Sequence, residues 1–379
     1  MRVLVLNYEF PPVGGGGGRA AEDICRALAS RGHEIRVQTS HVKGLPKFEE
    51  RDGYRIYRSF SFRRRADMCS VWEMAAYLVT NLVPALRQAV IWRPDLIHAH
   101  FAVPTGVLAW AVHFFTGTPY VLTVQLGDVP GALPEQTDHL FRVVKPFTLP
   151  IWRRAAAVVA VSRHIRDIAL NSYSVPIDII PNAVDLRQWS PGPVTLSRPK
   201  RLVFAGRFNP QKNLFFLINV LTRIVDLDWH LDMLGDGVLM DSLRREIKER
   251  GLQGRITLHG WVEPDSVERI MGRSDILVLP SISEGLPLVG TMALGLGLAI
   301  IGSRVGGITD IVEDGGNGYL FAVNDLDAFE RALRVLLESD DLLKTMKEMS
   351  RKMAGDFDLE NVATRYEEIY ERVKHSQNM

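Results

Sequence analysis

Residues 280–303 read PSISEGLPLVGTMALGLGLAIIGS, and the nineteen positions that follow Glu284 carry no charged side chain. A run of this length is long enough to cross a bilayer, which takes about eighteen or more apolar residues. Five glycines and Pro287 interrupt the run, however, and they would make a poor lipid-facing helix. We therefore expect a short buried helix from Pro287 to about Gly295, a turn, and a buried strand within AIIG, residues 299–302.

The rest of the chain alternates strand-like apolar runs with helix-length amphipathic segments. In the first half, the expected strands are RVLVLN, EIRVQTS, LIHAHF, YVLTVQL and AAVVAVS, and the expected helices are residues 19–31, 71–93 and 106–115. The order restarts after residue 199 with RLVFAG, WHLDMLG, RITLHG, DILVLP and AIIGS, each followed by a helical stretch. This alternation is typical of parallel sheets with helices on both faces, so we predict an α/β fold.

The length of the chain predicts two domains, because 379 residues exceed what one core usually holds. The proline-containing stretch LRQWSPGPVTLSRP lacks periodicity and is typical of a linker. We expect a first α/β domain over residues 1–185, a linker over 186–199 and a second α/β domain over 200–356. An amphipathic helix over 357–379 is expected to pack back on the first domain.

Composition excludes some classes of protein. The 45 basic and 44 acidic residues give a net charge of +1, which argues against a nucleic-acid-binding protein with a strong overall field. Cys25 and Cys69 are the only cysteines, too few for a disulfide scaffold and without Cys-x-x-Cys metal spacing. We expect two free thiols and a cytoplasmic location.

The segment FRRRADMCSVWEMAAYLV, residues 62–79, has two interpretations. In the first interpretation, the basic triplet Arg63 to Arg65 is a solvated turn that precedes a core helix. In the second, the segment is a patch that contacts anionic lipid or a lipid-linked acceptor, which would place the protein peripherally at the inner face of the plasma membrane.

Five consecutive glycines, residues 14–18, lie between the first strand and its helix. Glycine allows a ligand to approach the backbone closely, and the following helix start offers N–H groups to a phosphate. We therefore predict that Gly16 and Gly17 contact a phosphate. A dinucleotide fingerprint fits residues 15–20, but the second strand ends in Gln-Thr-Ser without the acidic residue that holds a ribose, so a nicotinamide cofactor is not expected.

Two cations follow the first strand of the second half. The stretch AGRFNPQKNL places Arg207 just past the strand and Lys212 at the start of the next helix. Ligands of open α/β sheets bind at the carboxyl ends of the strands, and two cations there suit a diphosphate. Two solvated surface charges are the alternative interpretation.

Three ionisable residues lie near strand ends in the first half. His98 and His100 share one face of a strand, but no nearby cysteine or carboxylate completes a tetrahedral set, so we expect no metal site. His100 is at the carboxyl end of its strand, where an active site is expected. Asp128 in QLGDVPG also follows a strand, and it is either a catalytic group or a turn-forming aspartate.

The opening stretch predicts a site for an anion. Glu284 follows the strand DILVLP, and Pro287 suits the first turn of a helix. That helix would direct its first N–H groups, at Leu288 and Val289, into the crevice of Arg207 and Lys212. A diphosphate fits there, with Glu284 beside it as an acceptor for hydroxyl groups.

With these segments in order, the chain resembles the retaining nucleotide-sugar glycosyltransferases of the GT-B fold, in the family 4-like group marked by two glutamates separated by seven residues. The motifs that carry the resemblance are IHAHF, LGDVPG, VVAVSRHIRDIA, IIPNAVDLRQW, AGRFNPQKN, MLGDG, LHGWV, PSISEGLPLV and GSRVGGITDIVEDGGNGYLF. It implies two Rossmann-like domains that face a central cleft, with the donor bound mainly by the second and the acceptor mainly by the first.

The same resemblance implies roles for individual residues. Arg207 and Lys212 hold the diphosphate, the loop at Gly16 and Gly17 closes over it, and Glu284 meets hydroxyls of the transferred sugar. The further residues that it places are His100 at the reaction centre, Gly235 of MLGDG at the donor and Val262 by the base.

One position departs from the family pattern, because the second glutamate would fall at residue 292, where this chain has Met292. In the family that glutamate contacts the ribose. We expect a metal-independent and cofactor-independent transferase that moves a hexose from a UDP- or GDP-sugar to a hydroxyl of a glycan or lipid-linked acceptor. The alternatives are a non-catalytic relative that binds nucleotide sugars and a nucleotide-sugar epimerase.

Overall fold

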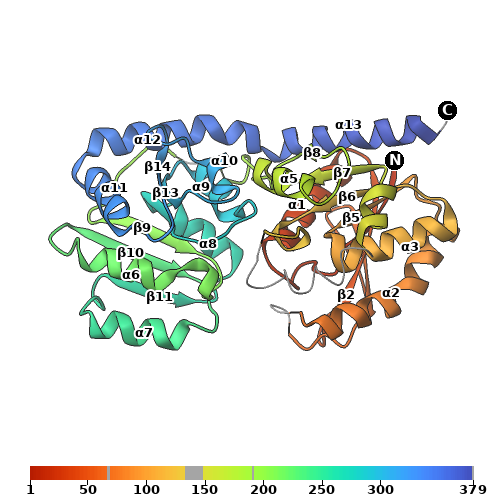
Figure 1. The fold of residues 1–379 in the computed structure, drawn as a ribbon, viewed down its shortest axis with the longest axis horizontal. Helices are drawn as coiled ribbons and strands as arrows, with labels where there is room; N and C mark the ends of the chain where they lie inside the picture. Colours follow the sequence, from red (N-terminus) through yellow and green to blue (C-terminus); the bar gives the residue numbers. More distant parts are fainter. Residues whose placement is uncertain (66–68, 133–147, 190–191, 378–379) are drawn as a thin grey trace. The chain divides into compact units, whose positions relative to one another are not determined.

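The computed structural model describes the chain except residues 66–68, 133–147, 190–191 and 378–379, and except the side chains of residues 264, 265 and 377. The chain divides into two compact units. The first unit contains Met1–Ala183 and Leu359–Met379, and the second contains Val184–Asp358. Each has a largely parallel sheet flanked by helices, so the predicted fold class, two Rossmann-like α/β domains, is confirmed (Figure 1).

The first unit is built on an eight-stranded sheet of order β3-β4-β2-β1-β5-β6-β7-β8. Its strands are β1 (Arg2–Leu6), β2 (Glu34–His41), β3 (Phe48–Arg51), β4 (Tyr54–Phe60), β5 (Leu96–His100), β6 (Tyr120–Val124), β7 (Ala157–Ala160) and β8 (Asp178–Ile179). All neighbours pair in parallel except β3 and β4. The sequence analysis did not predict β3, β4 or β8. In β4, YRIYRSF, polar residues alternate with apolar ones instead of forming a continuous apolar run.

Helices cover both faces of this sheet. They are α1 (Gly16–Ser30), α2 (Val71–Ile91), α3 (Val107–Thr116), α5 (Arg163–Leu170) and α13 (Leu359–Gln377), with short helical turns η1 (Ala102–Gly106) and η2 (Leu126–Asp128). Apolar side chains of α1 and α13 share one core with alternate residues of the strands, such as Val3 and Val5. This packing follows from the strand period of two, which sends alternate side chains to opposite faces.

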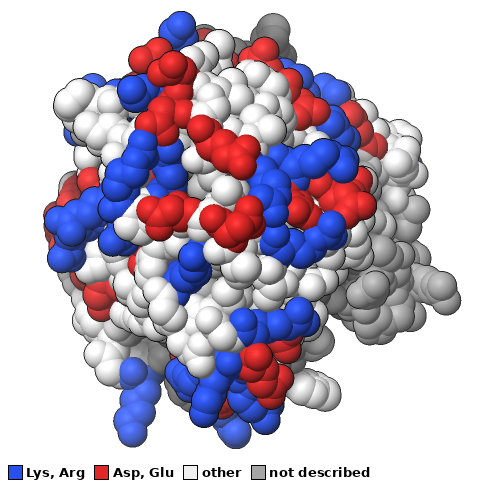
Figure 2. Space-filling model, turned by 90° about the vertical axis from the view of Figure 1, so that its left-hand side faces the viewer, with Lys and Arg blue, Asp and Glu red and all other residues white. Residues whose placement is uncertain are grey.

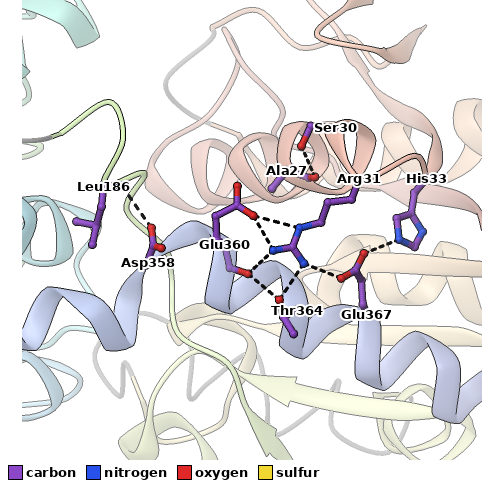
Figure 3. A network of polar contacts seen from close by, with 9 residues as sticks. All are labelled: Ala27, Ser30, Arg31, His33, Leu186, Asp358, Glu360, Thr364 and Glu367. Carbon is purple, nitrogen blue, oxygen red and sulfur yellow. Dashed lines mark hydrogen bonds and ion pairs between the residues drawn. The ribbon is translucent and has the colours of Figure 1, made fainter.

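Arg31, directly after α1, ties α13 to this unit (Figure 3). Its guanidinium donates to the carboxylates of Glu360 and Glu367, at 2.6 Å each, and to the hydroxyl of Thr364 at 2.9 Å. His33 contacts the second oxygen of Glu367 at 2.8 Å. Long helices gain most of their stability from packing, so these contacts and the shared core fix α13 as part of the first unit.

The second unit has a six-stranded parallel sheet of order β11-β10-β9-β12-β13-β14. The strands are β9 (Lys200–Ala205), β10 (Trp229–Leu234), β11 (Ile256–Gly260), β12 (Ile276–Leu279), β13 (Ala299–Ser303) and β14 (Gly318–Phe321). The helices are α6 (Leu214–Thr222), α7 (Met240–Glu249), α8 (Pro264–Met271), α9 (Leu288–Leu296), α10 (Ile308–Ile311), α11 (Leu326–Glu338) and α12 (Asp340–Met353), with short turns η3 (Pro210–Lys212) and η4 (Ala354–Phe357).

Residues 280–303 adopt the structure that their glycines and proline predict. Pro287 precedes α9, Gly297 ends that helix in a left-handed conformation at φ 70°, and the buried strand β13 follows. The run is therefore a helix and a strand of the α/β core, and the membrane-span interpretation is wrong.

One face of the second unit carries charges of both signs. Figure 2 shows Lys and Arg interspersed with Asp and Glu on this face. Ion pairs also connect charged side chains of this unit, as where Arg334 lies 2.8 Å from Asp226 and 2.9 Å from Glu330. This mixture suits a solvated surface and not a phosphate-backbone footprint.

Candidate functional site

The two predicted groups of the second unit lie at its topological switch point. The chain runs from β9 to β10 and β11 on one side, and then returns to place β12 on the other side of β9. The loops after β9 and β12 therefore diverge, which opens the crevice where ligands of doubly wound sheets bind. Arg207 and Lys212 follow β9 and Glu284 follows β12, so three predicted residues flank this crevice.

Lys212 and Glu284 form an ion pair there. Lys212 Nζ lies 2.5 Å from Glu284 Oε1, and the Ser281 hydroxyl donates to the same oxygen at 2.7 Å. The Glu284 side chain is only 7% exposed and that of Lys212 19%. A buried carboxylate requires such partners, because its desolvation is otherwise costly. The sequence analysis placed both residues in one crevice but did not predict their pairing, nor the part of Ser281.

Gln211 joins the two loops that carry this pair. Its side-chain amide donates to the Ser283 carbonyl at 2.8 Å, and its own carbonyl accepts from the Ile282 N–H at 2.8 Å. Lys212 directly follows Gln211, and Glu284 directly follows Ser283, so these hydrogen bonds bring the two charged residues together. The sequence analysis missed Gln211, whose only signal was its place beside Lys212.

Glycines allow the loops at this sheet edge to cross backbone against backbone. A Cβ on Gly235 would lie 1.9 Å from the Gly206 carbonyl oxygen, and one on Gly306 would lie 1.8 Å from the Glu284 carbonyl oxygen. Gly306 also has a φ of +53°, a conformation that favours glycine. Gly235 was predicted at the donor, and the structure shows that it packs the loop after β10 on the loop after β9. Gly306 was not predicted, and the absence of a side chain there lets the loop after β13 pack directly on the backbone of Glu284.

The start of α9 offers backbone donors. No side chain caps it, and Pro287 adopts an extended conformation before the first turn. Such a helix start has N–H groups without partners inside the helix and the positive end of the helix dipole. Leu288, Val289 and Met292 are half-buried along this first part of the helix. The N-terminus of α9 can therefore receive an anion, and its neighbour Glu284 cannot serve as that anion's partner.

The remaining predicted residues of the second unit are close to strand ends. Arg207 is exposed two positions past β9, and Val262 is half-buried two positions past β11. Trp261 beside it is 69% exposed. A separate cavity of about 260 Å³ is lined by residues of α8, α9 and α12, such as Arg269, and includes none of the predicted site residues. We place the site at the switch point, because the ion pair of Lys212 and Glu284 and the exposed Arg207 lie there.

The predicted residues of the first unit also lie at a switch point, between β1 and β5. The glycine loop follows β1, and His100 ends β5. A Cβ on Gly17 would lie 2.7 Å from the ring of Phe101, which itself adopts a φ of 74°. Positive φ at a bulky residue is strained, and such strain gathers at functional sites. Gly16 starts α1 and is exposed.

His100 is buried in a neutral state. The side chain is 2% exposed, and burial lowers its pKa to about 3. Within the described part of the chain, its Nε2 has no hydrogen-bond partner. The ring lies 4.1 Å from that of His98, centroid to centroid. A neutral imidazole with an unused nitrogen can accept or donate a hydrogen bond to a ligand, but it is a poor proton carrier near pH 7.

His98 is fully engaged by the protein. One ring nitrogen pairs with the Thr123 hydroxyl at 2.8 Å and the other with the Tyr370 hydroxyl at 2.7 Å. Among the described residues, no group of three or more His, Cys, Asp or Glu side chains is arranged to hold a metal ion. The two hydrogen bonds satisfy both ring nitrogens of His98 inside the core.

Asp128 holds the turn that follows His100. One carboxylate oxygen accepts the N–H groups of Ala102 and Val103 at 2.8 and 3.2 Å, and the other accepts that of Gln125 at 2.8 Å. Burial raises the pKa of Asp128 to about 7, against the opposing effect of these hydrogen bonds. The structure therefore gives Asp128 a positioning role, and its predicted catalytic role stays a prediction.

Arg63 lies neither in a solvated turn nor in a surface patch, so both interpretations of the basic triplet are wrong for this residue. Its side chain is fully buried. It donates to the Tyr8 carbonyl at 3.1 Å and to the Glu9 carboxylate at 3.4 Å. Glu9 in turn accepts the Gly15 N–H at 3.3 Å, so Arg63 supports the glycine loop. The sequence could not show this, because the partners lie more than fifty positions away.

Comparison with known families agrees with this architecture. Residues 14–188 match the model described as Glycosyltransferase Family 4, and residues 189–353 match the model described as Glycosyl transferases group 1. The chain carries a family 4 glycosyltransferase domain followed by a group 1 domain. The family 4 domain contains the glycine loop, His100 and Asp128, and the group 1 domain contains the Lys212–Glu284 pair.

Individual relatives extend over the whole chain. A glycogen synthase of Mycobacterium tuberculosis is 26% identical over 403 residues, which cover 100% of this chain and 96% of that protein. Sucrose-phosphate synthase from Thermosynechococcus elongatus has a TM-score of 0.86 at 18% identity and covers 99% and 100% of the two chains. The Anabaena protein HepE, solved with UDP-glucose, has a TM-score of 0.76 at 16% identity and covers 97% and 98%. The likeness to these two solved structures shows that the chain has the GT-B fold.

Proposed function

We propose that this glycosyltransferase moves a hexose from a nucleoside diphosphate sugar to a hydroxyl group, with retention of configuration at the anomeric carbon. The observation that carries the proposal is the Lys212–Glu284 pair at the switch point, beside the uncapped start of α9. A cation and backbone N–H groups suit a diphosphate, and a carboxylate suits sugar hydroxyls. The donor needs both kinds of contact.

Arg207, Lys212 and the N-terminus of α9 bind the diphosphate in this proposal. When the bond between the anomeric carbon and the phosphate oxygen breaks, the nucleoside diphosphate leaves with the electron pair. Cations and helix N–H groups stabilise this charge, which is the main way that such a site can lower the barrier. The acceptor oxygen then bonds to the same face of the anomeric carbon, and its proton passes to the departing phosphate.

Glu284 orients the sugar. One of its oxygens is already held by Lys212 and Ser281, so the carboxylate has a fixed direction before the donor arrives. A fixed acceptor for sugar hydroxyls brings the anomeric carbon into a reactive position at low entropic cost. Glu284 therefore contributes by orientation and not as a nucleophile. Gly235 and Val262 remain predicted donor contacts, the latter near the base.

The family 4 domain is proposed to bind the acceptor, a glycan or a lipid-linked sugar, in the cytoplasm. His100 is the predicted contact at the reaction centre, and Gly16 and Gly17 are predicted phosphate contacts. HepE binds UDP-glucose. That likeness supports a UDP-sugar as the first donor to try, followed by GDP- and ADP-sugars.

Met292 favours a second candidate, a relative that binds nucleotide sugars without turnover. A thioether is only a weak hydrogen-bond acceptor, so ribose hydroxyls lose a charge-assisted contact there. Such a loss costs about 1.5 to 3 kcal/mol, which weakens binding but leaves the diphosphate and sugar contacts in place. We therefore favour an active enzyme with weak donor recognition.

A donor screen followed by product analysis tests the proposal. Thermal shift with UDP-, GDP- and ADP-hexoses identifies the donor, and release of nucleoside diphosphate is then measured with and without candidate acceptors. An active retaining enzyme releases more diphosphate when acceptor is present and forms a product with the donor's anomeric configuration. An isomerised donor without acceptor would indicate the epimerase, and binding without release would indicate the non-catalytic relative.

A further inference from the structure

Helix α2 exposes an apolar stripe to solvent. Five of its large apolar side chains are at least 64% exposed, namely Val71, Trp72, Val79, Val83 and Ile91, and Val90 is 60% exposed. Trp72, Val79, Val83 and Val90 lie within about 40° of one another around the helix axis and form one stripe, and Val71 and Ile91 flank it at the helix ends. A surface helix of a globular protein normally places charged residues on that face. The stripe therefore needs a partner or a function.

The opposite face of α2 is fixed to the sheet by polar contacts. Gln38 on β2 donates to the Asn81 side chain at 2.7 Å, and Gln88 donates to Gln38 at 2.9 Å. Tyr77 and Asn81 are fully buried. By length and composition alone α2 could cross a membrane, since it has 21 residues and contains an 18-residue window with a mean hydropathy of 1.2. Crossing would expose this buried polar face to lipid, so α2 can contact a membrane only lying flat.

Neighbouring side chains extend the apolar surface. Helix α3 packs against α2 and exposes Phe114 and Phe115 by 70% and 66%. Both helices lie in the orange part of the first unit (Figure 1). Phe60 and Phe62, which precede α2, are 58% and 63% exposed and pack on each other at 4.6 Å. Isolated exposed apolar residues are ordinary, but a set of this size on adjoining segments marks an interaction site.

The charges around the stripe are mostly positive. Exposed arginines lie before α2, within it and after it, namely Arg64, Arg87 and Arg93. The one acid of α2 is Glu73, whose carboxylate accepts the backbone N–H groups of Ser70 and Arg64 at 2.7 and 2.9 Å and so caps the helix. An anionic partner therefore finds exposed cations beyond both ends of α2 and, at Arg87, near its C-terminal end.

We propose that the α2 stripe docks on the surface of an anionic phospholipid bilayer, with α2 parallel to the membrane plane. Apolar side chains enter the boundary between headgroups and acyl chains, Trp72 lies at the interface that tryptophan favours, and the arginines meet lipid phosphates. Docking places the family 4 domain where a lipid-linked acceptor would be.

Vesicle binding by the full-length protein tests this proposal. Sedimentation is measured with phosphatidylcholine vesicles and with vesicles that contain about 30% phosphatidylglycerol, without donor or acceptor, so the result is independent of sugar transfer. We expect binding to the anionic vesicles that weakens with added salt. The variant Trp72→Ser/Val79→Ser/Val83→Ser should lower the partition coefficient by at least about tenfold, since it removes most of the buried apolar area. Arg87→Glu/Arg93→Glu should abolish the preference for anionic lipid.

A control variant separates this surface from exposed apolar residues in general. Leu170→Ser/Val225→Ser/Val335→Ser changes side chains that are 42 to 49% exposed on other elements, and it should bind vesicles like the unchanged protein. Circular dichroism and thermal unfolding should be alike for all variants. The proposal is overturned if the unchanged protein does not bind, if binding is equal on both vesicles, or if the α2 variant matches the control. It is also overturned if light scattering shows a dimer that only the α2 variant dissociates and vesicles do not bind.

Discussion

Lys212 and Glu284, 72 positions apart in sequence, meet through a 2.5 Å contact between Nζ and Oε1 at the switch point of the group 1 domain. The pair joins the residue proposed to hold the diphosphate to the residue proposed to hold the sugar. An incoming diphosphate would therefore compete with Glu284 for Lys212. This competition gives the two residues separable effects on binding and on transfer.

Replacement of the Glu284 carboxylate separates the effect on binding from the effect on transfer most clearly. Glu284→Gln keeps the shape of the side chain but leaves Lys212 without its counter-charge, so a free nucleoside diphosphate should bind several-fold more tightly. Transfer should fall by at least about tenfold, because the oriented acceptor for sugar hydroxyls is weakened and each tenfold corresponds to 1.36 kcal/mol. Titration calorimetry and initial rates measure the two effects. Unchanged transfer would remove Glu284 from the proposed machinery.

Lys212→Ala and Arg207→Ala should differ in stability although both weaken donor binding. Each loses a charge-assisted contact with the diphosphate, worth about 1.5 to 3 kcal/mol. Lys212→Ala also strands the buried carboxylate of Glu284, which should lower the free energy of unfolding by about 2 kcal/mol. Arg207 is exposed, so its loss should leave stability almost unchanged. Urea unfolding measures this difference, and the double variant Lys212→Met/Glu284→Gln should recover stability but not binding.

Met292 tests ribose recognition. The residue is half-buried one turn beyond Leu288, and side chains on a helix point back toward its start. Met292→Glu should therefore offer a carboxylate to the ribose and tighten binding of the nucleoside diphosphate by about ten- to a hundred-fold. The donor KM should fall accordingly. Equal affinities for the two proteins would show that the ribose is recognised elsewhere.

Gly306 and Gly315 form a matched pair for testing the loop crossing. Both have positive φ, +53° and +80°, so an alanine at either position carries backbone strain of about 1 kcal/mol. Only Gly306 also faces a backbone oxygen, that of Glu284, at 1.8 Å from a Cβ. Gly306→Ala should therefore cost at least about 2 kcal/mol more in unfolding free energy than Gly315→Ala. Similar losses would contradict the close approach.

Local sequence signals predicted the elements but not the contacts between distant residues. Pro287 and Gly297 bracket α9, and continuous apolar runs mark the parallel strands, so these elements could be predicted from local chemistry. The Lys212–Glu284 contact depends on strand order, because β12 returns beside β9 only after two intervening strands. No pattern around either residue contains that information.

Contacts between distant residues also explain why the sequence did not predict the environments of Arg63 and Asp128. Arg63 reads as part of a solvated basic triplet, yet its partners Tyr8 and Glu9 come from the loop after the first strand. Asp128 reads equally as a turn residue or a catalytic group, and only the structure shows its bonds to Ala102 and Val103. Charge type is visible in a sequence, whereas burial and partners are set by tertiary packing.

Acid should destabilise the family 4 domain through its buried histidines. Burial lowers the pKa of His100 to about 3, while the unfolded chain has the ordinary value of 6.5. The folded state thus binds fewer protons, so this stability is present above pH 6.5 and is lost as the pH falls toward 3. The loss is about 1.4 kcal/mol per pH unit for one group. His98 acts in the same direction, because burial also lowers its pKa.

His100→Gln should flatten this dependence. The pKa of Asp128, raised to about 7, acts with the opposite sign, because its stability is present at low pH and lost as the pH rises from 3.8 toward 7. Asp128 is present in both proteins, so its contribution cancels when the unfolding free energy of the variant is subtracted from that of the unchanged protein. Urea unfolding at pH 7, 5.5 and 4.5 measures this difference, and parallel pH curves would show that folding does not lower the pKa of His100.

The central claim is that the crevice around Lys212 and Arg207 binds the donor diphosphate, and calorimetric titration tests it most directly. The nucleoside diphosphate of the best donor is titrated into the unchanged protein and into Arg207→Ala/Lys212→Ala. We predict that the double variant, shown folded by circular dichroism, binds at least about a hundredfold more weakly. Equal affinity of the two proteins would contradict the account.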